Sequence, residues 1–300
     1  MNSLPEGFFG QGRAYRQTKH GGSMKKHLST IVLIIVFLAG LGLMMYPTIS
    51  DLINKAHQSV VMNSYDEQVS NMSEEEFDAI LEDARRYNSK LTTNEFPRDE
   101  EDLEGNAEYQ AAMNPLGTGV MGYIKIDSIG LKMPIYHGTR EAVLQTGVGH
   151  IPTTSLPVGG KSTHAVITGH RGLPSARLFT DIDKLEIGDM FYIYVLDDVL
   201  AYKVDQITTV LPTETKDLQI IKGEDHVTLV TCTPYGINTH RLLVRGTRTE
   251  YKPEIEKESA ARVIRRTDDP LLVIPLICAV SFVFMLIIVI IKNRKRREKA

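Results

Sequence analysis

Two long apolar runs, one near each end of the chain, constrain what this sequence can fold into. Leu28–Tyr46 is a run of 19 residues that is polar only at Ser29 and Thr30, and Leu271–Ile291 holds one proline and no charge. Each run is long enough to cross about 30 Å of hydrocarbon as a helix. We therefore expect two transmembrane helices, at 28–46 and 271–291, with the folded part of the chain between them.

The charge distribution predicts which way these helices run. Residues 1–46 carry five Lys and Arg against one Glu, and residues 271–300 carry six against one. The middle, 47–270, holds 23 basic and 35 acidic side chains. Under the positive-inside rule both termini lie in the cytoplasm and the acidic middle lies outside the cell membrane. Such a body repels phosphate, so nucleic acid is not an expected partner, whereas the two apolar runs make membrane lipid an expected one.

A cleaved signal peptide is the alternative for the first run. The run is longer than the usual 7–15 apolar residues of such a peptide, which favours a retained anchor. Met24-Lys25-Lys26 followed by an apolar run is typical of a bacterial membrane signal, so residues 1–23 are interpreted as sequence upstream of the natural start.

The residues after the first run have a helical pattern, and those after 115 have the pattern of short strands. Ser73 and Glu76 form a capping box, and apolar residues follow at helical spacing from Phe77 to Ala84. From Gly122 onward, seven or eight short β segments separated by turns indicate a closed barrel or a sandwich. The predicted organisation is a cytoplasmic N-terminus (1–27), a transmembrane helix (28–46), a helical region with an acidic loop (47–115), a mainly β domain (116–250), a charged stalk (251–270), a second transmembrane helix (271–291) and a basic cytoplasmic tail (292–300).

Cysteine usage draws attention to one residue. Of the two cysteines, Cys278 lies inside the second apolar run, so Cys232 is the one thiol of the outward-facing part. Exported proteins usually pair their cysteines or lose them, so a lone one suggests a reactive thiol. A buried, inert cysteine of the core is the alternative.

Three residues at predicted strand ends have the side chains that acyl transfer needs. Cys232 ends the strand His226–Thr231, Arg241 opens the next strand nine residues later, and His170 follows a strand that begins at Ala165. A thiolate is a nucleophile, an imidazole transfers protons, and a guanidinium holds a developing oxyanion. The spacing alone is weak evidence, because nine histidines offer many Cys/His pairs. No zinc-ligand spacing and no phosphate-binding loop occurs, so no metal and no cofactor is expected.

The residues around these three resemble a known family. Thr228-Leu229-Val230-Thr231-Cys232 matches the TLxTC signature of sortases, the Gram-positive cysteine transpeptidases, and His170 and Arg241 stand where that family keeps its histidine and arginine. Several longer runs, together with the C-terminal span and its basic tail, are similar to class C, the pilin-polymerising branch. These runs are Leu156–Gly160, Thr168–Pro174, Arg177–Asp181, Cys232–Tyr235 and His240–Gly246.

The resemblance implies a fold, a reaction and partners. The fold would be mainly β, a sortase-type eight-stranded β-barrel with N-terminal helices. Cys232 would attack the Thr–Gly bond of an LPxTG-like sorting signal, His170 would act as general acid and base, and Arg241 would hold the oxyanion or substrate. The partners would be pilin subunits, and an acceptor lysine of the next pilin would complete an isopeptide bond.

One departure from the class C pattern concerns a lid. Class C sortases usually carry an Asp-Pro-aromatic motif that plugs the active site, whereas this chain has Asn94-Glu95-Phe96-Pro97 in the corresponding region. Phe96 is therefore the lid-equivalent residue, and we expect no regular lid, because an acid before the proline is missing.

Further residues near the predicted site have weaker signals. Thr231, Tyr235 and Asn238 are candidates for substrate binding because they flank Cys232 along the chain. His164 is expected at a surface or strand edge. A structural role is predicted for His137, His150 and His226, and His240 is expected to face away from Arg241.

Three other functions compete with pilin polymerisation. A housekeeping sortase that anchors surface proteins to the cell wall would use the same three residues and a different amine. An exported cysteine protease would need water as acceptor, and no papain-like signature surrounds Cys232. A membrane-anchored β domain that only binds surface proteins would keep its function after Cys232→Ala.

Overall fold

A computed structural model describes residues 21–92, 105–263, 277–285, 287–288 and 291. The chain divides into two compact units, Met1–Met44 and Met45–Ala300, and the long helix α1 (Gly21–Ser70) runs from the first into the second, through Pro47. Within the described residues one helical segment, Ile34–Ser70, is long and apolar enough to cross a membrane. Of the predicted second span, the described residues are helical and all the others lie outside the described residues, so that span stays a prediction.

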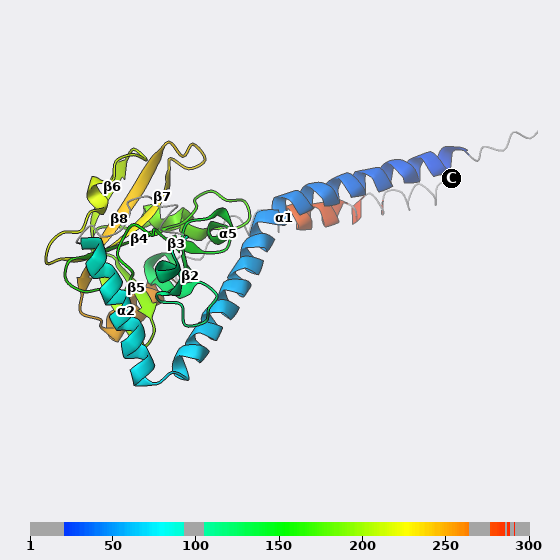
Figure 1. Cartoon of the computed structure of the whole chain (residues 1–300). Helices are drawn as coiled ribbons and strands as arrows, with labels where there is room; N and C mark the ends of the chain where they lie inside the picture. The colour runs from blue at the N-terminus through cyan, green and yellow to red at the C-terminus, as the bar shows by residue number, and fades with distance from the viewer. Residues whose placement is uncertain (1–20, 93–104, 264–276, 286, 289–290, 292–300) are drawn as a thin grey trace, which may run out of the picture. The chain divides into compact units, whose positions relative to one another are not determined.

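The second unit is built on a closed barrel of eight strands, as the sequence predicts. The strands follow one another around the barrel in the order β1-β2-β3-β4-β7-β8-β6-β5 (Figure 1). Most neighbours are antiparallel, but β2–β3 and β4–β7 are parallel pairs. The bounds are β1 Val120–Ile126, β2 Leu131–His137, β3 Val148–His150, β4 Thr163–Thr168, β5 Met190–Val195, β6 Asp198–Val210, β7 Asp225–Thr233 and β8 His240–Thr249.

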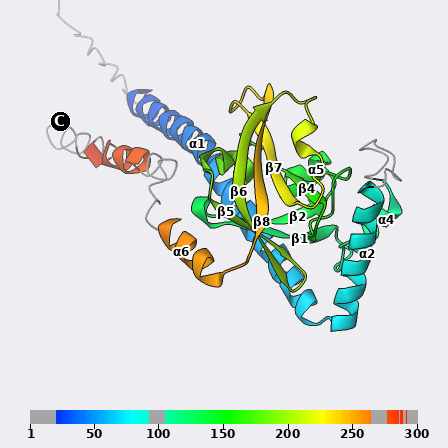
Figure 2. The same cartoon turned by 90° about the vertical axis from the view of Figure 1, so that its left-hand side faces the viewer.

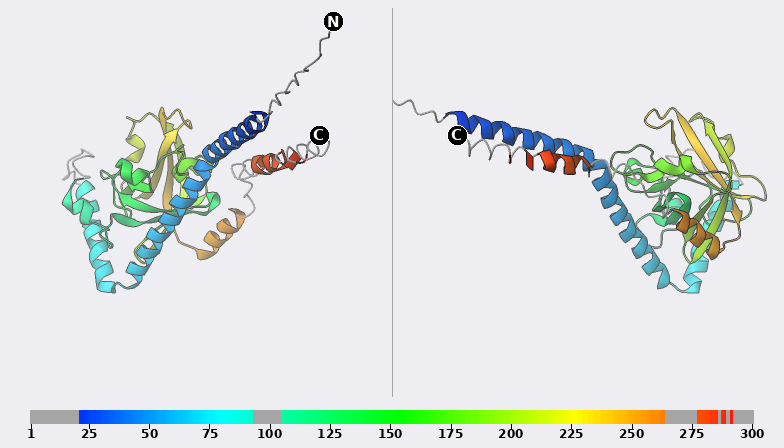
Figure 3. Two further views of the ribbon diagram at one scale, coloured as in Figure 1. Left: turned by 90° about the vertical axis from the view of Figure 1, so that its right-hand side faces the viewer. Right: turned by 180° about the vertical axis from the view of Figure 1, so that it is seen from behind.

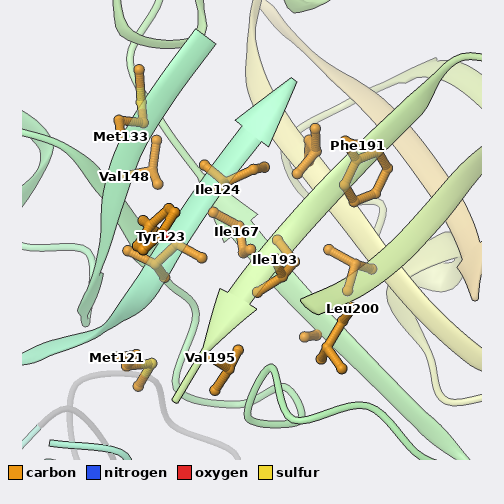
Figure 4. Close-up of a cluster of buried hydrophobic side chains, with 14 of the residues drawn as sticks. Met121, Tyr123, Ile124, Met133, Val148, Ile167, Phe191, Ile193, Val195 and Leu200 are labelled. Atoms are coloured by element: carbon orange, nitrogen blue, oxygen red, sulfur yellow. The ribbon is translucent and has the colours of Figure 1, made fainter. Parts of the chain in front are cut away.

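Side chains on successive strand positions divide between two apolar clusters. Because neighbours along a strand point to opposite faces, Leu229 and Val244 belong to the main core, while Val230 and Leu243 belong to a small second cluster. Figure 4 shows part of the main core, where side chains of β1 and β5 such as Ile124 and Ile193 meet. The wall made by β4, β7 and β8 is therefore buried on both faces over much of its length.

The N-terminal helices pack on this barrel. A short turn joins α1 to α2 (Glu74–Thr92) (Figure 3). The predicted capping box is confirmed, because Ser73 N donates to Glu76 Oε2 over 2.8 Å and Glu76 N donates to Ser73 Oγ over 3.3 Å. Tyr65 of α1 is fully buried, and its hydroxyl donates to the Met121 carbonyl over 3.0 Å. Shorter helices complete the unit: α4 Ala107–Ala111, η1 Asp127–Ile129, α5 Glu141–Leu144, η2 Leu178–Lys184, η3 Lys216–Leu218 and α6 Pro253–Val263.

The helix α6, which falls in the predicted stalk, is attached to the barrel by one buried carboxylate. Glu256 accepts hydrogen bonds from Lys125 Nζ and from the Tyr194 hydroxyl, each over 2.5 Å. The Tyr251 hydroxyl donates to its second oxygen over 2.6 Å. Burial opposes ionisation of this group, and the bonds from Lys125 and the tyrosines outweigh it and lower the pKa of Glu256. The carboxylate therefore fixes α6 against β1 and β5.

Candidate active site

Two of the three predicted catalytic residues lie on adjacent paired strands, and the third lies two residues past the end of the neighbouring strand β4. β7 lies between β4 and β8 in the barrel (Figure 2). In the antiparallel pair of β7 and β8, Cys232 stands opposite Arg241. In the parallel pair of β4 and β7, Thr168 stands opposite Val230, so the same register carries His170 to the level of Cys232. The three predicted catalytic residues therefore lie at the same end of three neighbouring strands.

The thiol sits where the outer face of the barrel wall opens to solvent. Cys232 shares its face with Val230 of the second apolar cluster, because side chains two positions apart point the same way. It is half-buried and free, and the loop that follows it, residues 234–239, is exposed. The cysteine is therefore not an inert core residue: it borders an open surface, as a nucleophile must.

His170 makes one side-chain contact that the sequence analysis did not anticipate. Its Nε2 lies 3.3 Å from Glu141 Oε2 of α5. The other carboxylate oxygen accepts a hydrogen bond from Gln145 Nε2. The bonds from Gln145 and then from His170 lower the pKa of the Glu141 carboxyl. Nothing in the sequence marks this contact, since Glu141 lies 29 residues before His170 on a helix of four residues.

Arg241 is held by the backbone of the loop before it. Its Nη1 donates to the carbonyls of Asn238 and His240, over 3.3 and 3.2 Å. Asn238 has a positive φ of 61°, a left-handed conformation that asparagine adopts more readily than most residues. The remaining guanidinium donors are available to a ligand, and no acidic side chain lies within ion-pair distance of Arg241 in the described part of the chain.

Arg171 joins the segment after His170 to the segment after Cys232. Its guanidinium pairs with Asp183 of η2, donates to Thr233 Oγ1 over 3.3 Å, and lies 5.8 Å from the centre of the Tyr235 ring. The Arg171 side chain is only 10% exposed. It therefore holds the two catalytic segments in a fixed relation, a role that the sequence analysis missed.

The predicted substrate-binding residues differ in accessibility. The Tyr235 side chain is 60% exposed, and Asn238 is exposed beside it. Thr231 is buried, and its hydroxyl donates to the Gly169 carbonyl over 2.7 Å. Thr231 thus joins β7 to the residue before His170 from within the protein. Phe96, the lid-equivalent residue, lies outside the described residues.

The expectation for His164 is wrong, because this side chain is buried and 1% exposed. Its Nδ1 lies 2.9 Å from the Gln219 carbonyl and its Nε2 lies 2.7 Å from Thr228 Oγ1. The segment between β6 and β7 covers this face of the barrel, so a position on the outer face of a strand is not exposed here. Burial lowers the pKa of His164 to about 4, so the ring is neutral.

A half-buried thiol that stands opposite an arginine, with a histidine just past the neighbouring strand, is suited to acyl transfer by a cysteine. Comparisons with known proteins agree with this chemistry. A sortase domain model matches residues 124–249. Sortase A from Bacillus anthracis is 31% identical over 127 residues, which are 42% of this chain and 59% of that relative's length.

Three solved structures of sortase C are similar over the second unit. Sortase C1 from Streptococcus agalactiae has a TM-score of 0.60 at 46% identity, covering 64% of this chain and 99% of its own. Sortase C from Clostridium perfringens, solved with the C-terminal cell wall sorting motif, has a TM-score of 0.56 at 44% identity, covering 64% of this chain and 100% of its own. Sortase C from Streptococcus pneumoniae, described with pilin substrate specificity, has a TM-score of 0.56 at 45% identity, covering 64% of this chain and 97% of its own. The chain belongs to the sortase family of cysteine transpeptidases, and its likeness to these structures is to class C.

Proposed function

We propose that this chain is a membrane-anchored class C sortase that polymerises pilins. It cleaves an LPxTG-like sorting signal between Thr and Gly and joins the Thr carbonyl to a lysine of the next subunit. The observation that supports this proposal is the register that pairs Cys232 with Arg241, together with the position of His170 two residues past the end of the neighbouring strand β4. The sortase C structures of C. perfringens and S. pneumoniae, with their sorting motif and pilin specificity, support the substrate class.

The reaction follows from the chemistry of the three side chains. The Cys232 thiolate attacks the Thr carbonyl carbon and forms a C–S bond, while Arg241 donates hydrogen bonds to the oxyanion. When the C–N bond breaks, His170 gives its proton to the departing glycine amine. A lysine amine then attacks the thioester and gives a proton to His170. The C–S bond breaks, the thiolate is restored, and an isopeptide bond remains.

The loop after Cys232 offers a surface for the sorting signal. Tyr235 and Ile237, in the loop that follows Cys232, are 60% and 68% exposed. Large apolar side chains this exposed are suited to binding the Leu-Pro part of an LPxTG segment. We assign Tyr235 and Asn238 to substrate binding and Thr231 to the support of β7.

The orientation of the chain belongs to the same proposal. One apolar helical segment, Ile34–Ser70, is a candidate anchor. Two spans with both termini in the cytoplasm would hold the catalytic domain outside the membrane, where we expect it to meet pilin subunits. Attachment of α6 through Glu256 would keep the barrel close to the second span.

A covalent ladder tests this function. The full chain in detergent micelles is mixed with the major pilin of the source organism, and the products are separated on a denaturing gel, with Cys232→Ala as the matched control. A ladder that only the wild type forms supports pilin polymerisation. Cleavage of an LPxTG peptide in the presence of a small amine, without a ladder, indicates wall anchoring instead. If neither reaction occurs, the enzymatic proposal is wrong and a binding module remains.

A further inference from the structure

Glu141 is the one acidic side chain within 4.0 Å of the His170 ring in the described part of the chain. The sequence offers no motif for it, and sortase chemistry as set out above uses only a thiol, an imidazole and a guanidinium. Its position raises the question of what a carboxylate does beside the proton-transferring group.

The backbone that carries Glu141 is held firmly. α5 lies against β3, and a Cβ on Gly149 of β3 would come within 3.2 Å of Leu144 Cδ2, so the helix packs closely on the strand. Gln58 of α1, itself buried, donates to the Thr146 carbonyl just after α5 over 2.8 Å. The Glu141 side chain is exposed, but its attachment point is fixed.

The segment that carries His170 is tied to the same helix. Asn54 Nδ2 of α1 donates to the Ser175 carbonyl over 2.9 Å, in the stretch that follows His170. Asn54 and Gln58 are four residues apart, so they lie on one face of α1. One face of α1 therefore contacts both the segment that carries Glu141 and the segment that carries His170, and this limits how far the two segments move apart.

The contact between them selects one nitrogen of the imidazole. The bonds that lower the pKa of Glu141 keep it ionised near neutral pH, and a carboxylate only accepts hydrogen bonds. The His170 Nε2 at 3.3 Å must then carry its hydrogen. In the neutral ring the other nitrogen, Nδ1, is left unprotonated. Gln145 occupies the second carboxylate oxygen and stops the group from rotating away.

We infer that Glu141 is a positioning residue of the proposed reaction, which orients the His170 imidazole so that Nδ1 exchanges protons with the departing and the incoming amine. Nδ1 takes the proton of the Cys232 thiol when the thiolate forms, Nδ1–H gives that proton to the glycine nitrogen as the C–N bond breaks, and Nδ1 takes a proton from the lysine amine as the new C–N bond forms. Glu141 and Nε2–H stay as they are throughout. This inference rests on the proposed acyl transfer by Cys232.

Substitution at Glu141 tests the inference by a split between kcat and KM. For cleavage of an LPxTG peptide by the detergent-solubilised full chain, we expect Glu141→Ala to lower kcat roughly three- to tenfold. KM should stay within about twofold of the wild type, because the carboxylate does not touch the peptide. Glu141→Asp, which keeps the charge, should recover part of the lost kcat, and Gln145→Ala should give a smaller loss of the same kind.

A matched control separates this effect from the loss of any surface carboxylate. Glu250 is 78% exposed and pairs with Lys252 over 3.2 Å. It follows the last residue of β8, whereas Arg241 lies near the first. Glu250→Ala should leave kcat and KM unchanged, and thermal unfolding should show that all variants are folded. An active wild type together with an unchanged kcat in Glu141→Ala overturns the inference. A wild type inactive on every peptide overturns the proposed function instead.

Discussion

Two buried neutral histidines make this fold sensitive to mild acid. His150 and His164 expose 0% and 1% of their surface. Burial lowers their pKa values from 6.5 to about 3 and about 4. In the unfolded chain both rings bind a proton as the pH falls through 6.5, whereas in the folded chain they do not. Their contribution to stability is therefore complete above pH 6.5 and is lost progressively as the pH falls toward the folded values.

The size of the loss follows from the linkage relation. One pKa unit corresponds to 1.36 kcal/mol, so each of these histidines lowers the free energy of unfolding by about 2 kcal/mol between pH 7.5 and pH 5. The two histidines together lose about 4 kcal/mol, a large part of the 5–15 kcal/mol of a typical domain. Carboxyl groups with lowered pKa values, such as Asp205, lose their contribution mainly below this window.

His164→Gln isolates one of the two contributions, because glutamine does not titrate. We expect the loss of stability between pH 7.5 and pH 5 to be about 2 kcal/mol smaller in the variant than in the wild type. Urea unfolding followed by the near-ultraviolet circular dichroism of the buried tyrosines measures both values, since the chain has no tryptophan. Equal losses in the two proteins, within about 0.5 kcal/mol, refute the reasoning.

Three further predictions concern packing, attachment and the lid. Gly122→Ala places a Cβ 2.2 Å from the Tyr194 carbonyl oxygen, a backbone atom that moves only with its strand. We therefore expect the free energy of unfolding, measured by thermal unfolding, to fall by about 3 kcal/mol. An unchanged midpoint contradicts this. Glu256→Gln removes the charge that Lys125 faces, and we expect the free energy of unfolding to fall by about 1–3 kcal/mol. An unchanged free energy would show that Glu256 does not hold α6 on the barrel. Phe96→Ala should leave peptide turnover unchanged, and a several-fold rise would show that a lid operates.

The barrel could be predicted because its signals are local. Seven of the eight strands show as short apolar runs between turns, and the TLxTC motif identifies Cys232 together with its neighbours. The strand β3 escaped prediction because Val148–His150 has three residues and a central glycine, too short for any alternation to appear.

The supporting residues of the site could not be predicted, because they depend on pairing between distant segments. Arg171 and Glu141 gain their roles only when η2 and α5 are brought beside the catalytic strands. His164 was misjudged for a related reason. Alternation along β4 predicts exposed side chains on one face of the strand only if that face meets solvent. Here the segment before β7 covers the face and buries the His164 ring.

The parallel pairing of β4 with β7 also has a consequence for the order of folding. Cys232 and Arg241 belong to a hairpin and are nine residues apart, so they meet through a short loop. His170 reaches Cys232 only when strands 62 residues apart pair, which costs more loop-closure entropy and forms more slowly. A folding chain therefore carries the thiol and the guanidinium close together before His170 joins them. The proposed reaction thus requires the barrel to close first.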